Sequence, residues 1–192
     1  MRYKKDHKQQ THQKIIEVAA GNFRTQGFEG VSIGRLMSNL DLTHGGFYRH
    51  FSNKEELYTE ALAYSVEEVQ ARLLERVTNP ESPSLKEVIV TYLSEEHCDA
   101  IGQGCPVAAL STDVSRQSAE IRSSFDGCLQ KYMQRFLLLM PGETQENKTK
   151  RFLVLFSGMA GALSVARAVS DPAMRQAILE SAREFYINTF CE

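Results

Sequence analysis

Proline and glycine are both scarce in this sequence of 192 residues, which contains five Pro and twelve Gly. A protein built from many strands and turns needs more of both, so their scarcity favours helices. Apolar residues make up 42% of the chain, more than an intrinsically disordered protein would carry. No alternating strand pattern and no internal repeat occur. We therefore expect an all-α fold of about nine helices.

Metal-binding cysteine motifs and membrane-spanning runs are also missing. The four cysteines, Cys98, Cys105, Cys128 and Cys191, include no C-x-x-C pair, and no His lies at a zinc-like spacing from two of them. The longest mostly apolar run, residues 152–166, is shorter than the about 20 residues that span a bilayer. No secretory signal follows Met1. We expect a cytoplasmic protein with reduced thiols, no metal, no cofactor and no membrane segment.

Charge is distributed unevenly along the chain. The formal net charge is only −2, which excludes a uniformly basic coat for nucleic acid. Residues 1–50, however, hold eight Lys or Arg and four Asp or Glu, a net charge of +4, together with four of the five His. The remaining residues have a net charge of −6. The asymmetry predicts an anionic partner for the N-terminal part.

Helix start signals divide the chain into segments. Ser32 is the expected N-cap of a helix that carries Ile33, Leu36, Met37 and Leu40. Capping boxes are predicted at Ser52–Glu55 and Ser84–Glu87, with a break at 79–83 between them. Pro106 should open a short helix, and Asp171-Pro172 should open the last one.

The stretch 32–54 has helix-turn-helix spacing, with a tight turn at 39–42 between two short helices. Thr43 can cap the second helix, and Gly45 and Gly46 leave its first turn without side chains. Two such glycines cost about 1 kcal/mol each in helix propensity. In return, the backbone and its dipole can approach DNA closely. The following side chains, Tyr48, Arg49, His50 and Lys54, can donate to phosphates.

These residues resemble the TetR family of transcriptional regulators, in the helix 15–27, in FEGVSI at 28–33 and in LTHGGFYRHFSNKEEL at 42–57. The resemblance implies a dimeric regulator, usually a repressor, that a small molecule releases from a double-stranded DNA operator. It places Ser32 and Arg35 at the start of the supporting helix. It places His44, Gly45 and Gly46 against bases. The residues that it places on phosphates are Tyr48, His50 and Lys54. It divides the chain into a DNA-binding domain, 1–54, and a ligand-binding and dimerisation domain, 55–192.

Some of these residues have plainer explanations. The family usually has Gly where this chain has Asp41, although Asp tolerates the left-handed conformation better than most residues. Tyr48 can simply pack, His50 can bond the backbone, and Lys54 can be an exposed cap residue. Ahead of the first helix, Lys4, Lys5 and Lys8 form either a DNA-binding arm or a solvated tail.

The helix expected at 147–169 is apolar nearly all round and needs cover on two sides. Gly158, Gly161, Ala162 and Ala166 would let a partner helix approach, so we predict a homodimer held by this helix and the last one. The alternative is a monomer with one central buried helix. The interface residues predicted are Phe152, Phe156, Met159, Gly161, Leu163, Ile178 and Phe185.

A ligand pocket is expected among residues 60–140. The candidate lining residues, each of which can equally be ordinary core, are Tyr64, Tyr92, His97, Phe125, Tyr132 and Met133. No catalytic motif is found, and the adjacent His97 and Cys98 would point in different directions on a helix. We therefore expect no enzyme. A helical carrier or enzyme is the alternative that would bind no DNA.

Cys105 offers a second mode of regulation. It precedes Pro106 at the start of the short helix, where the dipole favours the thiolate. Together with Cys98, it is a candidate sensor of electrophiles. The alternative is a cysteine that fills a small space beside Gly102 and Gly104.

Overall fold

The computed structural model describes residues 2–75 and 84–191. Within these ranges the chain forms ten α-helices, one 3₁₀ helix and no strand, which agrees with the predicted all-α class. The break predicted at 79–83 lies outside the described residues. The elements are α1 (Arg2–Gly30), α2 (Ile33–Ser38), α3 (His44–Phe47), α4 (Lys54–Glu75), α5 (Leu85–Tyr92), α6 (Glu95–Asp99), η1 (Ile101–Gln103), α7 (Pro106–Val114), α8 (Ala119–Phe136), α9 (Gln145–Ala168) and α10 (Pro172–Phe190).

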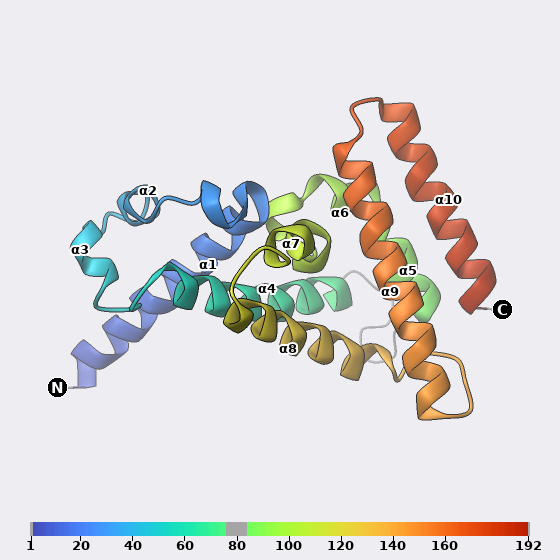
Figure 1. Cartoon of the computed structure of the whole chain (residues 1–192), viewed down its shortest axis with the longest axis horizontal. Helices are drawn as coiled ribbons and strands as arrows, with labels where there is room; N and C mark the ends of the chain where they lie inside the picture. Colours follow the sequence, from blue (N-terminus) through green and yellow to red (C-terminus); the bar gives the residue numbers. More distant parts are fainter. Residues whose placement is uncertain (1, 76–83, 192) are drawn as a thin grey trace.

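The molecule is elongated, with α2 and α3 at one end and α9 and α10 at the other (Figure 1). α4 packs along α1 and also contacts α8, so it connects the two ends. α7 lies in the middle, in contact with α1, α4, α8 and α9. The predicted division between residues 54 and 55 therefore falls in the first turn of α4, a helix that both ends share.

The first helix is longer than its apolar periodicity indicates. α1 begins at Arg2, so Lys8 is part of this helix and does not lie in an arm ahead of it. The side chains of Lys4 and Lys5 are outside the described part of the structure. Gly27, with a φ of 71°, interrupts the helical backbone close to the end predicted from sequence.

Helix caps follow the local sequence, with one shift in register. Ser32 caps α2, and Ser84 with Glu87 forms the predicted capping box of α5. At α4 the predicted box, Ser52–Glu55, is wrong. Asn53 Oδ1 instead accepts from the Glu56 backbone N–H at 2.8 Å, and the Glu56 carboxylate reaches back to the Ser52 N–H.

The C-terminal part packs around α9, as the apolar run predicts. Of the described helices, α9 alone is long and apolar enough to cross a membrane by length and composition. It packs against α6, α7, α8 and α10, as the core helix of a bundle does. Its buried side chains are Phe152, Leu155, Phe156, Met159, Ala160, Leu163 and Ala166.

Candidate nucleic-acid interface

α3 is a single helical turn fixed by one apolar anchor and one cap. Phe47 is buried and stacks on Phe51 with ring centroids 5.4 Å apart. Thr43 Oγ1 accepts from the Gly46 backbone N–H at 3.2 Å, which confirms Thr43 as the N-cap. The turn continues past Phe47, because the His50 N–H donates to the Phe47 carbonyl at 2.8 Å. One side of α3 is thereby held in the core while the other faces outward.

The two glycines of α3 have different surroundings. A Cβ on Gly45 would meet nothing within 4 Å, so this residue presents bare backbone to solvent. A Cβ on Gly46 would lie 3.3 Å from Thr43 Oγ1, against the cap itself. Gly45 is therefore the position in this turn where a duplex can approach the backbone without displacing protein atoms.

The turn between α2 and α3 keeps its shape without glycine. Asp41 has a φ of 57°, the left-handed conformation that Asp tolerates. The N–H of Leu42 donates to the Met37 carbonyl at 2.9 Å and closes the turn. The departure from the TetR pattern at position 41 leaves the helix-turn-helix geometry intact.

Most side chains predicted to contact DNA lie on the exposed surface formed by α2, the turn and α3. Two of the predicted phosphate donors, Lys54 and His50, pack against other side chains and are only partly exposed. The Lys54 ammonium lies over the Phe28 ring, 4.6 Å from its centroid. His50 is half-buried, and its Nδ1 has no hydrogen-bond partner among the described residues. The exposed members of the predicted set are Ser32, Arg35, Thr43, His44, Gly45, Tyr48 and Arg49.

His50 adjoins a histidine that the sequence did not single out. The ring of His12 lies 5.8 Å from that of His50, and its Nε2 is 2.9 Å from Glu60 Oε2 on α4. Partial burial, followed by the charges of His12, Lys8 and Arg49, lowers the pKa of His50. His50 is therefore held toward its neutral form at the edge of the exposed surface.

A groove of about 920 Å³ extends this surface onto α1. Its walls combine the turn and α3 with His7, Lys8 and Thr11 of α1. Sequence reasoning missed His7 and Thr11 because it started the first helix near Ile15. The periodicity of Arg2–Gly30 is weak at its polar N-terminal end, so only the backbone reveals this wall.

The predicted pocket residues separate into three groups. Phe125 and Met133 line a groove of about 770 Å³ between α7, α8 and α9. Tyr92, His97 and Tyr132 are buried around Cys105, where the Cys105 N–H donates to His97 Nε2 at 3.0 Å. The third group is Tyr64 alone, partly buried on α4. The groove also has walls from residues not predicted, among them Val107, Ser111, Asp126, Leu129, Gln130 and Ala160.

The predicted interface needs correction on α9. The side chains of Phe152, Phe156, Met159 and Leu163 are at most 3% exposed within the single chain, so they offer no surface to a partner. Gly158 faces Tyr186 of α10, and Ala166 is buried. Of the predicted set, Gly161 is open, Phe185 is 62% exposed and Ile178 is half-buried. The exposed apolar residues of this face also include Leu153, Val154, Val165 and Met174, of which Leu153 and Val165, like Gly161, also line the groove between α7, α8 and α9.

The cysteines are free thiols, and the described residues contain no group of three His, Cys, Asp or Glu placed to hold a metal. Cys98 and Cys105 are both buried. Cys105 is the N-cap residue of α7, as its place before Pro106 predicts. Its Sγ lies 3.9 Å from the Tyr132 hydroxyl.

Known proteins agree with this geometry. Residues 15–61 match the family described as bacterial regulatory proteins, tetR family. The matched residues run from α1 through the helix-turn-helix into α4 and make up about a quarter of the chain. A curated relative, the HTH-type transcriptional regulator AcrR of Shigella flexneri, is 36% identical over 56 residues, which are 29% of this chain and 26% of the relative. The match therefore spans about a quarter of that TetR-family protein.

Solved structures share this fold over most of the chain. A TetR-family regulator from Cytophaga hutchinsonii has a TM-score of 0.75 at 21% identity, covering 93% of this chain and 94% of its own. The structure of AibR in complex with isovaleryl coenzyme A and operator DNA has a TM-score of 0.58 at 17% identity, covering 91% and 96%. At these identities the likeness concerns the fold alone.

Proposed function

We propose that the chain is a dimeric transcriptional regulator that binds a palindromic operator and leaves it when a small apolar molecule binds. The observation that carries the DNA-binding part is the exposed first turn of α3, where Gly45 presents bare backbone beside His44. A capped helix start without side chains suits close contact with a DNA edge. Repression is the expected sign of regulation.

Selection of duplexes from a random pool tests this function. The purified full-length chain should enrich a short palindrome, and footprinting should show the same protection in the promoter next to its own gene. Two recognition helices about 34–36 Å apart would read the two halves. Enrichment of no duplex would contradict the proposal and favour the carrier or enzyme alternative.

The second subunit is proposed to cover the exposed apolar face of α9 and α10. Val154 on α9 and Phe185 on α10 are both 62% exposed, and a Cβ on Gly161, at the edge of the groove between α7, α8 and α9, would meet nothing within 4 Å. Exposed apolar side chains that gather on one face of a protein favour association. Light scattering should give a dimer mass, and a stable monomer that binds the selected duplex would refute this part.

The groove between α7, α8 and α9 is the proposed effector site. Phe125, Leu129 and Met133 supply apolar walls, and Asp126 is the single charged residue among the described residues that line it. Without a Lys or Arg in its walls, the groove suits a neutral or cationic apolar molecule and disfavours a phosphate-bearing thioester. This differs from the ligand named in the AibR structure.

Three probes with the same ten-carbon chain test the ligand class. Decyltrimethylammonium and 1-decanol should release the selected duplex, whereas decanoyl-coenzyme A should not. Asp126→Asn should remove any preference for the cation over the alcohol while leaving the alcohol's effect unchanged. Release by the thioester alone would show that the effector site lies elsewhere.

A further inference from the structure

α7 separates the proposed effector groove from α1. Val107, Ser111 and Thr112 of α7 line the groove, while the helix packs on α1 and α4 as well. In Figure 1 it lies between the two ends of the molecule. A molecule that widens the groove must displace α7. The contacts between α7 and α1 then determine whether this displacement also moves α2 and α3.

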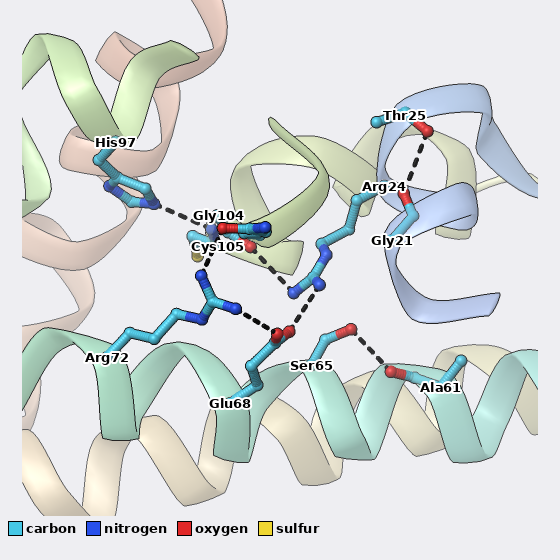
Figure 2. Close-up of polar contacts among 11 residues, drawn as sticks. Gly21, Arg24, Thr25, Ala61, Ser65, Glu68, Arg72, His97, Gly104 and Cys105 are labelled. Carbon is cyan, nitrogen blue, oxygen red and sulfur yellow. Dashed lines mark hydrogen bonds and ion pairs between the residues drawn. The ribbon is translucent and has the colours of Figure 1, made fainter. Parts of the chain in front are cut away.

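One peptide group links the N-terminal end of α7 to both α1 and α6. The Gly104 carbonyl accepts from Arg24 Nη1 of α1 at 3.3 Å, and the N–H of the same peptide unit, on Cys105, donates to His97 Nε2 at 3.0 Å (Figure 2). Arg24 also pairs with Glu68 of α4 at 2.6 Å. The peptide that starts α7 is thereby fixed between α1 on one side and α6 on the other.

The loop that carries this peptide packs closely against its neighbours at both of its glycines. A Cβ on Gly104 would lie 2.5 Å from Arg167 Nη2 and 3.0 Å from the Ala100 carbonyl oxygen. On the α1 side, a Cβ on Gly102 would lie 3.3 Å from Thr25 Cγ2. η1 and the start of α7 are thus close-packed against α1, and close-packed contacts transmit displacement.

The C-terminal end of α7 has its own attachment. Asp113 Oδ2 accepts from the backbone N–H of Phe28 at 2.9 Å and lies 3.2 Å from the Tyr58 hydroxyl, which donates to it. Phe28 follows Gly27, where the backbone of α1 leaves the helical conformation, and lies five residues before the start of α2. Asp113 therefore fixes the backbone between the kink in α1 and the helix-turn-helix.

Burying the charged guanidinium group of Arg24 costs free energy, and packing alone does not require a charged residue at this position. The residue is 4% exposed and its Nε has no partner among the described residues. Buried ion pairs can often be replaced by apolar side chains without loss of stability, and their best-attested use is to specify one arrangement. Glu68 would keep a partner without Arg24, since Arg72 Nη2 lies 3.1 Å from its other oxygen.

We propose that Arg24 and Asp113 are positioning residues that transmit the displacement of α7 to α1 and the helix-turn-helix. Arg24 contacts the peptide just before α7, and Asp113 lies in the last turn of α7 and contacts the end of α1. Together they turn the movement of α7 into a change in the orientation of α1. This inference rests on the proposed function for one point, that the occupant of the groove moves α7.

The main test measures the affinity for the selected duplex with and without decyltrimethylammonium. In wild type the probe should weaken DNA binding by about 5–150-fold, the usual range of allosteric coupling. In Arg24→Met and Asp113→Ala that ratio should fall below about threefold, while the affinity without probe stays close to wild type. Arg72→Met is the matched control, because it removes the other arginine on Glu68 and its bond to Gln103 of η1 but leaves the Arg24–Gly104 bond, so it should keep the wild-type response. A full response in Arg24→Met overturns the inference.

A second test needs neither DNA nor ligand. Ser111→Trp adds bulk to the groove wall from α7 itself, and hydrogen exchange of residues 20–38 reports the response of α1 and α2. Exchange should rise in Ser111→Trp but not when Arg24→Met is also present. An equal rise in both, or no rise in Ser111→Trp, overturns the inference. A wild-type chain that selects no duplex contradicts the proposed function alone, and this exchange test still decides on Arg24.

Discussion

Replacing Gly45 with alanine should move stability and DNA affinity in opposite directions. Gly45 has no positive φ, and its Cβ would meet no protein atom within 4 Å, so alanine fits the folded backbone. A Gly→Ala change at a compatible position stabilises by about 0.4–1 kcal/mol, because it restricts the unfolded chain. For a chain of this length, that raises the melting temperature by about 1–4 °C. The added methyl group, however, occupies the surface proposed to meet the duplex.

The loss of close approach should cost about as much as a lost base contact, about 1–3 kcal/mol or 5–150-fold in affinity. Thermal unfolding by circular dichroism and titration of the selected duplex by fluorescence anisotropy measure the two effects. Gly46→Ala is the comparison, since its Cβ crowds the Thr43 cap and should cancel the gain in stability. A Gly45→Ala protein that melts higher and binds DNA like wild type would refute the assignment of this surface.

Other variants test the remaining parts of the proposal. His44→Ala should weaken and relax sequence-specific binding by about 1–3 kcal/mol, whereas Lys54→Ala should weaken binding to all duplexes and lower the salt slope by about one unit; wild-type behaviour of both would exclude this recognition surface. Val154→Glu should give a folded monomer in light scattering, because Val154 is 62% exposed, whereas Leu163→Glu should unfold the chain, because Leu163 is fully buried. The lowered pKa of His50 contributes stability that is present above its ordinary value of 6.5 and is lost as pH falls through the folded-state pKa. In denaturant unfolding, the free energy of unfolding should therefore fall less below pH 6.5 in His50→Gln than in wild type. An equal fall in both proteins would argue against a contribution of His50 to the pH dependence of stability.

Local chemistry allowed much of the fold to be predicted from sequence. The caps at Ser32 and Ser84 depend on neighbouring residues only, and both are confirmed. The start of α4 was wrong by one residue, because the sequence from Ser52 to Glu56 contains two overlapping capping patterns. In the structure Glu55 makes a tertiary contact instead, because its carboxylate lies 3.4 Å from the hydroxyl of Ser118, the N-cap of α8. Sequence cannot supply that contact.

The short elements α6 and η1 were missed for a related reason. Five residues and three residues are too few to show a helical period. They are fixed by distant partners, such as the Arg167 Nε that donates to the Cys98 carbonyl at 3.0 Å. The functional consequences of this region, including the attachment of Gly104 to Arg24, therefore become visible only in three dimensions.

The two faces of α9 show where periodicity gives no answer. Apolar side chains surround this helix, so the sequence indicates two covered sides without saying which side the chain itself covers. The structure buries Phe156 and Leu163 in the core and leaves Leu153, Val154 and Val165 outside. The dimer remains a prediction, but the side chains that would form it are different from most of those first assigned.

The sequence predicts that Cys105 could sense electrophiles, whereas the structure buries its thiol completely. Cys105 is the N-cap residue of α7, but it has no exposed surface, so a quinone can reach it only through local opening. Cys191 is partly exposed, although burial also raises its pKa and slows its reaction. We therefore expect wild type and Cys105→Ser to hold the selected duplex alike during brief quinone treatment. Release from wild type alone would establish Cys105 as a sensor and would require α7 to open before it signals.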